Sequence, residues 1–324
     1  MGFCSALEGA FGRARVGIGV PLAAYTTFKI GGPADFLVEA RETAEVLEAL
    51  RLARAAGVPV TILGGGSNLL VSDEGVRGLV VRLRRGTIEP VSERLVRADA
   101  GVALNALVRW SVARGLKGLE AWAGTPGTVG GAIRGNAHYG GRLIGDVVAD
   151  VRVVTAAGAL LDVPRAAMAF GYDRSRLQAS GEVLLWAVFE LAPGSPPSEL
   201  RDAARASLAG RRRTQPIGLA TAGCIFRNPD PSREEVPAGL PPSAGALIDR
   251  AGLKGRRIGG ASVSIQHANF IVNEGGARAA DVLALMRLCE REVQERFGIR
   301  LREEIVLLGA FEGLRGMCHP CPAC

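Results

Sequence analysis

A glycine-rich stretch at residues 124–141 constrains this chain more than any other feature. The stretch reads Gly-Thr-Pro-Gly-Thr-Val-Gly-Gly-Ala-Ile-Arg-Gly-Asn-Ala-His-Tyr-Gly-Gly. Because glycine has no Cβ, its N–H can contact a ligand directly, and its positive φ values let successive N–H groups point at one anion. We therefore predict that this stretch forms the backbone wall of a site for a large ligand.

A second glycine cluster follows the apolar run at residues 58–63, which we predict to be a buried strand. This cluster reads Gly64-Gly-Gly-Ser-Asn-Leu-Leu-Val71. Neither cluster continues into the Gly-Lys-Ser/Thr of a phosphate-binding loop, and we do not expect the cluster at 124–141 to open a helix as a dinucleotide fingerprint requires. One such cluster alone is typical of an ordinary turn, whereas the two together predict one long ligand that lies across both.

The composition is that of an ordinary globular protein. The chain has 324 residues, 48% hydrophobic and 22% charged, a length that allows two or three domains. It has no apolar run of about 18 residues and no signal-peptide pattern, so we expect a cytoplasmic protein without a membrane partner. The net charge of +7 comes mostly from arginine, which suits anionic small molecules. Because the basic residues are spread out and lack clustered aromatics, we expect no nucleic-acid partner.

The six cysteines do not make a disulfide framework in a chain of this size. Cys289 lies at helical spacing among the apolar residues of 279–297, so we expect it in the core. Cys318, Cys321 and Cys324 have ligand-like spacing beside a histidine, but no second cluster completes a structural zinc site. We therefore expect residues 313–324 to form a flexible tail, and we expect no metal site.

Hydrophobic periodicity predicts a mixed chain of helices and strands in three parts. In the first part we expect two strands within 26–38, a helix at 43–56 and a strand at 58–63. The second part is mainly β, with strands at 79–83, 95–98, 147–155, 160–163 and 183–191 and a helix at 104–114. After a Pro/Ser-rich break at 192–198 we expect a helix ending at 211–213, a helical turn at 246–251, β structure at 261–272, a helix at 279–297 and a strand at 305–308.

Seven segments, taken in order, resemble the motifs of the UDP-N-acetylenolpyruvoylglucosamine reductase (MurB) family. These segments are residues 26–34, 64–70, 124–141, 222–229, 243–255, 267–273 and 301–309. The resemblance extends over residues 20–311, and it matches the compact form of the family, which lacks a substrate-capping insertion. Seven motifs in the same order make this resemblance specific.

The resemblance implies an α+β fold of two FAD-binding subdomains of the PCMH/VAO type and a C-terminal α+β substrate-binding domain. It assigns residues 1–80, completed by a strand at about 300–312, to the first subdomain. The second subdomain is then residues 81–197, and the substrate-binding domain is residues 198–299. We take the Pro/Ser-rich break before residue 198 as the boundary between the last two parts.

The resemblance also implies an activity, its cofactor and its partners. The family passes hydride from NADPH to FAD and then to the enolpyruvyl double bond of a UDP-sugar, giving UDP-N-acetylmuramate, a peptidoglycan precursor. The expected partners are therefore small molecules, and we expect a monomer. By resemblance, the two glycine clusters contact FAD from opposite sides through Gly64, Gly65, Gly66, Ser67, Asn68, Leu69, Gly124, Thr125, Gly127, Gly130, Gly131 and Asn136.

Reduction of the double bond also needs an acid, because hydride delivery leaves enolate character that must be protonated on the adjacent carbon. The resemblance places Cys224 where most family members have serine, and a thiol with an ordinary pKa near 8.5 loses its proton more readily than an alcohol. A core position is the structural alternative for this cysteine. The resemblance places a catalytic glutamate at Glu304, expected to be protonated or bonded to water, with Glu303 as its solvent-facing neighbour.

The sequence departs from the family at a third catalytic position, an arginine directly after tyrosine. Here Asp173 follows Tyr172, and Arg174 comes one residue later. On a strand a shift of one residue reverses the side-chain direction, so a bulge is needed to bring Arg174 to the flavin side. We predict that Arg174 stabilises the developing negative charge.

Substrate phosphates and carboxylate need cations and hydrogen-bond donors. The resemblance implies that Asn228 contacts the uridine diphosphate, and we predict further contacts from Arg213, Gln215, Arg227, Tyr172 and Lys254. Two alternatives remain open at this point. The chain could be another FAD-dependent oxidoreductase of the same fold, or a catalytically impaired flavin-binding regulator.

Overall fold

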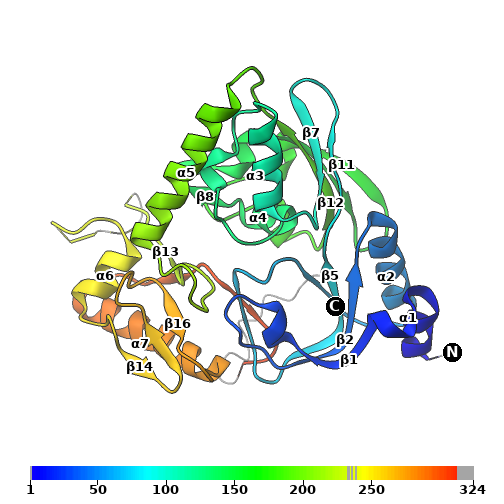
Figure 1. Cartoon of the computed structure of the whole chain (residues 1–324). Coiled ribbons are helices and arrows are strands. Elements are labelled where there is room, and N and C mark those ends of the chain that lie inside the picture. Colours follow the sequence, from blue (N-terminus) through cyan, green and yellow to red (C-terminus); the bar gives the residue numbers. More distant parts are fainter. Residues whose placement is uncertain (1, 232–233, 235, 238, 312–324) are drawn as a thin grey trace.

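The computed structural model describes residues 2–311 except 232–233, 235 and 238, and shows three packed units (Figure 1). The predicted tail with Cys318, Cys321 and Cys324 lies outside the described residues. None of the helices in the described part of the chain is long and apolar enough to span a bilayer.

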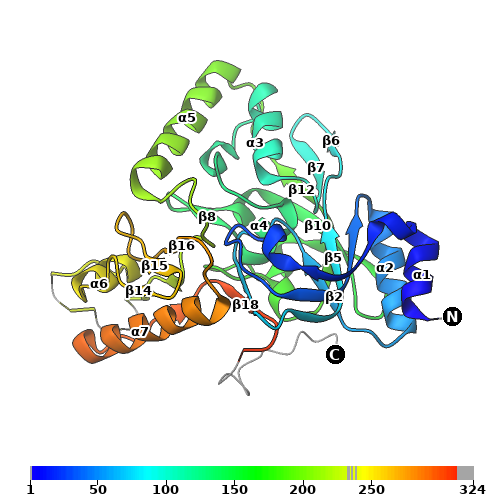
Figure 2. The same ribbon diagram turned by 60° about the horizontal axis from the view of Figure 1, so that its bottom comes forward.

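The first unit contains a four-stranded sheet in the order β1-β2-β5-β3, in which β1 is antiparallel to β2 and the other neighbours are parallel. Two helices pack together on it, at the side where Figure 2 shows the N-terminus. Helix α2 forms because its apolar residues recur at helical spacing, and it buries Val46, Ala49 and Ala53. The elements are α1 (Phe3–Phe11), β1 (Val16–Pro21), β2 (Pro33–Ala40), α2 (Thr43–Ala55), β3 (Val60–Leu63) and β5 (Val76–Leu83).

The strand predicted at residues 26–30 is wrong, because this segment is irregular. Lys29 has a φ of 57°, a left-handed conformation that no strand accommodates. Phe28 is buried in the core of the third unit, and the Thr27 hydroxyl donates to the Thr221 carbonyl at 2.7 Å. The apolar residues here therefore reflect burial between units rather than strand pairing.

The second unit is a five-stranded antiparallel sheet in the order β11-β10-β12-β7-β6. Strands β7, β10, β11 and β12 lie within one residue of their predicted bounds, whereas β6, β8, β9 and the short helix α4, which follows the glycine turn at 124–128, were not predicted. The strand predicted at 79–83 for this part is β5, which pairs in the sheet of the first unit. The elements are β6 (Ile88–Pro90), β7 (Leu95–Asp99), α3 (Leu104–Ala113), α4 (Val129–Gly135), β8 (His138–Tyr139), β9 (Arg142–Leu143), β10 (Val148–Val154), β11 (Leu160–Pro164), β12 (Val183–Glu190) and α5 (Pro197–Thr214).

Helix α5 packs on the second unit, against α3 and the 3-10 turn at Glu120–Trp122 (Figure 1). Leu200, near its start, joins the same hydrophobic core as the antiparallel sheet. The predicted boundary at residue 198 thus falls in the first turn of α5, a helix whose packing ties it to the preceding unit.

The third unit is built around helix α7, whose buried stripe includes Cys289, as predicted. The expected β structure at 261–272 is two short strands separated by a loop, since Ile265 in the middle of that range is 79% exposed. The elements are β13 (Phe226–Arg227), α6 (Ala244–Arg250), β14 (Arg257–Ile258), β15 (Ala261–Val263), β16 (Ile271–Asn273), α7 (Ala279–Phe297) and β17 (Arg302–Glu303).

The end of the described chain returns to the first unit. Strand β18 (Val306–Leu308) pairs in parallel with β4 (Leu69–Val71), which directly follows the glycine cluster at 64–66. The Val306 N–H donates to the Asn68 carbonyl at 3.0 Å, and the Asn68 amide donates to the Glu304 carbonyl at 3.2 Å. This pairing joins a catalytic candidate from the third unit to a predicted cofactor turn of the first.

Candidate active site

A cleft of about 2930 Å³ lies where the three units meet. Both glycine-rich turns line it, together with strand β3 of the first unit and the irregular segment at 215–219 that follows α5. Strand β3 is therefore only partly buried, because its outer residues form a wall of the cleft. The third unit contributes the segments around the catalytic candidates at residues 221–227 and 300–309.

The two glycine turns are in direct contact with each other. A Cβ placed on Gly65 would lie 2.5 Å from the Cα of Gly127, and one placed on Gly64 would lie 2.5 Å from Thr128 Oγ1. The Thr128 side chain in turn caps α4 by accepting from the Gly131 N–H at 3.3 Å. Only glycine allows both backbones to approach this closely, and the result is one continuous main-chain surface facing the cleft.

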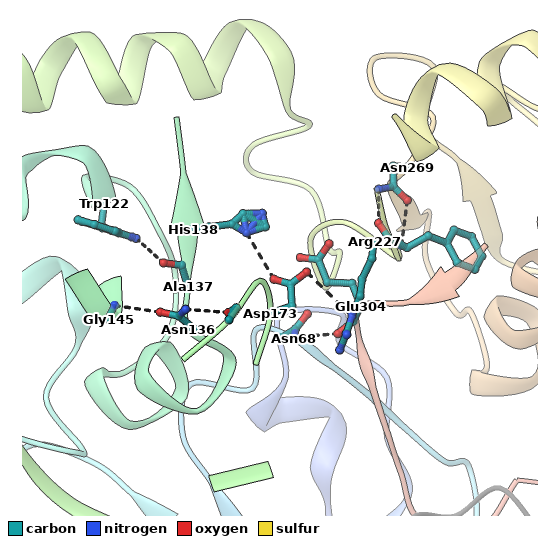
Figure 3. A network of polar contacts seen from close by, with 12 residues as sticks. Asn68, Trp122, Asn136, Ala137, His138, Gly145, Asp173, Arg227, Asn269 and Glu304 are labelled. Atoms are coloured by element: carbon teal, nitrogen blue, oxygen red, sulfur yellow. Dashed lines mark hydrogen bonds and ion pairs between the residues drawn. The ribbon is translucent and has the colours of Figure 1, made fainter. Parts of the chain in front are cut away.

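This surface fits a dinucleotide with a flavin ring. Eleven of the twelve residues predicted to contact FAD line the cleft, and Asn136 does not. Asn136 is fully buried, its Oδ1 accepts from the Gly145 N–H at 2.9 Å, and its Nδ2 donates to the Gly171 carbonyl at 2.8 Å (Figure 3). Its amide is thus used to hold the loop that carries Asp173, so the prediction that it contacts FAD is corrected.

Cys224 and Glu304 lie on neighbouring backbones at the wall of this cleft. Strands β13 and β17 are antiparallel, with Phe226 opposite Glu303, and the Glu304 N–H donates to the Ile225 carbonyl at 2.8 Å. Asn269 fixes the same segment, since its side chain bonds both the N–H and the carbonyl of Phe226, at 2.9 and 2.7 Å (Figure 3). Residues 267–273, one of the seven segments that resemble the family, therefore help to position Cys224 through Asn269.

Burial is the largest cause of the shifted pKa values of both Cys224 and Glu304. It raises the pKa of the Cys224 thiol far above its ordinary value, and the charges of Glu304 and Asp173 raise it further. The pKa of Glu304 is also raised well above its ordinary value, first by burial and then by the charge of Asp173. A raised pKa favours the neutral thiol of Cys224, which is the form that carries a proton to donate.

Asp173, rather than Arg174, points toward Glu304 (Figure 3). Gly171 and Arg174 exchange two backbone hydrogen bonds, of 3.0 and 3.1 Å, so Tyr172 and Asp173 form the tip of a tight turn instead of the strand that we expected. Arg174 lines the cleft but is exposed and packs along Gly171. The turn therefore puts a carboxyl at the position for which we predicted a guanidinium.

Arg211 is a cleft residue that the sequence did not single out. It is 6% exposed, and its Nε and Nη2 atoms have no hydrogen-bond partner among the described residues. Its guanidinium stacks 3.7 Å from the ring centroid of Tyr139, and it attracts the negative charge of an ionised Cys224. A buried cation without hydrogen bonds is costly unless a ligand completes it, so an anion fits here. The Arg211-Arg-Arg213 run was the available signal, but spacing alone did not tell which arginine faces inward.

The predicted substrate residues divide into two groups. Gln215 and Arg227 line the cleft. The other four lie outside its lining: Arg213 on the exposed side of α5, Asn228 with its Oδ1 accepting from the Ala244 N–H, Tyr172 beside the His138 ring, and Lys254 paired with Asp249 at 2.7 Å.

The packed units of the fold and the glycine-walled cleft between them define an FAD-binding oxidoreductase. A family model described as an FAD binding domain matches residues 34–164. A second, described as UDP-N-acetylenolpyruvoylglucosamine reductase, C-terminal domain, matches residues 215–308. The chain belongs to the UDP-N-acetylenolpyruvoylglucosamine reductase family, and is accordingly a flavoprotein reductase that uses FAD and NADPH. The predicted α+β flavin fold is confirmed.

Similar proteins support this assignment over nearly the whole chain. The UDP-N-acetylenolpyruvoylglucosamine reductase of Anaeromyxobacter sp. (strain Fw109-5) is 46% identical, covering 91% of each chain. That of Synechococcus sp. (strain WH7803) is 43% identical, covering 90% of this chain and 92% of the relative. The crystal structure of MurB from Thermus caldophilus aligns with a TM-score of 0.74 at 36% identity, covering 90% of this chain and 98% of that one.

Proposed function

We propose that this cleft reduces the enolpyruvyl group of UDP-N-acetylglucosamine-enolpyruvate to UDP-N-acetylmuramate, with Cys224 as the proton donor. The observation that carries the assignment of the donor is the neighbouring placement of Cys224 and Glu304. Both are held at the cleft wall by β13 and β17, and Asn68 of the glycine turn bonds directly to the Glu304 backbone. This geometry supports a proton donor and a cofactor turn that act on one substrate group.

When bound, FAD supplies the two-electron chemistry that couples NADPH oxidation to reduction of the double bond. The glycine turns at 64–66 and 124–131 would hold it, because their main chain forms the cleft surface. Hydride arrives at the terminal enolpyruvyl carbon, and the electron pair of the double bond moves toward the adjacent carbon and its carboxylate. Cys224 Sγ then gives its proton to that adjacent carbon and is left as a thiolate.

The surroundings of Cys224 suit this transfer. A high thiol pKa keeps the proton on sulfur until a strongly basic carbanion forms next to it, and the carbon acid formed is much weaker than the thiol. The charge of Arg211 favours the thiolate that remains. We assign the same guanidinium to an anionic group of the substrate, since Arg211 lines the cleft and two of its nitrogens have no hydrogen-bond partner among the described residues.

Several finer points belong to this proposal. The cleft is lined by one chain, which supports a monomer as the working unit. Nucleotide-activated sugars and NADPH are cytoplasmic metabolites, so we place the reaction in the cytoplasm. Membership of the family and the reaction make the protein part of peptidoglycan precursor synthesis.

The experiment is steady-state NADPH oxidation by the purified flavoprotein, with and without the enolpyruvyl UDP-sugar, followed by mass spectrometry of the product. In deuterated water the product gains one deuterium at the carbon next to the carboxylate. NADPH oxidation that depends on oxygen but not on the UDP-sugar would favour another FAD oxidoreductase. A flavin that is bound but not reduced by NADPH would favour a regulator.

A further inference from the structure

Asp173 is held in an unusual place for a carboxylate. It sits at the tip of the Gly171–Arg174 turn with a φ of 50°, and its side chain is only 10% exposed. The Asn136 amide anchors this turn by donating to the Gly171 carbonyl, and the Ser175 hydroxyl donates to the Arg134 carbonyl at 2.7 Å. The turn is thus fixed from both sides, and the Asp173 side chain points into the cleft (Figure 3).

The neighbours of Asp173 compensate its charge without hydrogen-bonding it. His138 Nδ1 lies 3.4 Å from Oδ1, and Arg227 Nε lies 4.0 Å from Oδ2. Asp173 Oδ2, His138 Nδ1 and Arg227 Nε are all buried and without a hydrogen-bond partner in the part of the chain that the structure describes. His138, Asp173 and Glu304 lie close together. One ring nitrogen of His138 and one carboxylate oxygen from each of the other two residues are all within 4.8 Å of one another.

Two carboxyl groups this close in a buried site cannot both ionise at neutral pH. We propose that Asp173 and Glu304 form a carboxyl pair that holds one proton, and that Asp173 is a positioning residue that keeps Glu304 in its neutral form. The location of the proton follows from the charges. Asp173 has Arg227 and His138 at ion-pair distance, so the negative charge settles there, and the proton settles on Glu304.

The shifts in pKa agree with this geometry. Burial raises the pKa of Asp173, whereas His138 and Arg227 lower it. Burial and the charge of Asp173 raise the pKa of Glu304, and Arg227 lowers it. The titratable and charged groups that face the pair are His138 from β8, Arg227 from β13, Tyr172 from the same turn and Cys224 from the preceding segment.

The consequence for the reaction, which rests on the proposed function, concerns the charge next to Cys224. An ionised Glu304 would repel both the carbanion and the thiolate, whereas a neutral Glu304 can donate a hydrogen bond to either. Asp173 therefore acts on turnover through Glu304 and needs no contact with the substrate.

The test is Asp173→Asn in the FAD-loaded enzyme, because asparagine keeps the shape and removes the charge. Without that charge the pKa of Glu304 falls, so the loss of activity at high pH should move down by about one pH unit or more. Asp173→Glu should restore the parent profile. An Asp173→Asn profile that coincides with that of the parent would overturn the proposal.

Infrared difference spectroscopy gives a readout that needs no turnover. A protonated-carboxyl band that is present at neutral pH and missing in Glu304→Gln should disappear at lower pH in Asp173→Asn than in the parent. If this band titrates as expected in an enzyme that does not reduce the UDP-sugar, the pair stands and the proposed function falls. Absence of the band at neutral pH overturns the pair, and so does a band that depends on prior treatment with EDTA, because a cation would then join the carboxyl groups.

Discussion

Gly65 and Gly127 meet backbone to backbone, so closely that a Cβ on the first would lie 2.5 Å from the Cα of the second. The residues belong to different units, yet together they make one surface of the cleft. This contact explains why two glycine clusters are needed, since a side chain on either turn would separate the two turns that line the cleft.

Replacing Gly65 with alanine should therefore weaken cofactor binding. The added methyl group collides with main chain that cannot move aside without opening the contact between units, so we expect FAD affinity to fall by about tenfold or more. Flavin retention after gel filtration and fluorescence titration of the apoprotein measure this. Gly9→Ala, at a helical position of α1 with nothing within 4 Å, is the control and should leave retention unchanged. Equal retention by both variants would contradict the prediction.

Cys224→Ser should keep most of the activity, whereas Cys224→Ala should lose about 10²- to 10⁴-fold in kcat, because only serine still offers a proton. Reduction of the flavin by NADPH should be the same in both variants when measured by stopped flow, since that step needs no proton from this side chain. Cys4→Ser, in α1, is the matched thiol control. An alanine variant with parental kcat would remove Cys224 from the mechanism.

Alkylation of Cys224 should be slow at neutral pH and should accelerate as the solution becomes more alkaline. The thiolate is the reactive form, and burial raises the pKa of Cys224, so the thiolate fraction at pH 7 is small. Mass spectrometry of iodoacetamide-treated Cys4→Ser enzyme across a pH series measures this rate together with residual activity. Fast labelling of Cys224 at pH 7 would show that its surroundings do not raise its pKa.

Arg211→Met should raise the KM for the UDP-sugar by about tenfold or more, because methionine keeps the apolar stem and removes the unpaired cation. Arg213→Met, on the same helix but outside the cleft lining, should change KM little. Flavin content should be unaffected in both. Similar KM values for the two variants would place the anion subsite elsewhere in the cleft.

The sequence was most informative where pattern and burial coincide. Helix α7 has the predicted bounds because its apolar residues recur at helical spacing toward a single core. The glycine clusters predicted a shared ligand wall, because the absence of a Cβ is itself the property that the cleft uses. The apolar residues at 26–30 led to a wrong prediction of a strand. Phe28 is buried in a contact between units, which no local sequence pattern encodes.

Side-chain direction within the site could not be read from the sequence. Asn136 and Asn68 both lie in glycine-rich motifs, but only the structure shows that the Asn136 side-chain amide hydrogen-bonds to the backbones of Gly145 and Gly171. Arg211 and Arg213 are two residues apart on α5, and helix packing alone decides which one is buried. The choice between Asp173 and Arg174 depended on a turn whose geometry neither residue specifies by itself.

Strand β18 reaches back across the molecule to pair with β4, and this has a consequence for biosynthesis. A ribosome makes β4 long before β18, so the nascent protein cannot complete this pairing until β18 has left the ribosome. Flavin incorporation should therefore wait for β18, and chains terminated before it should emerge colourless.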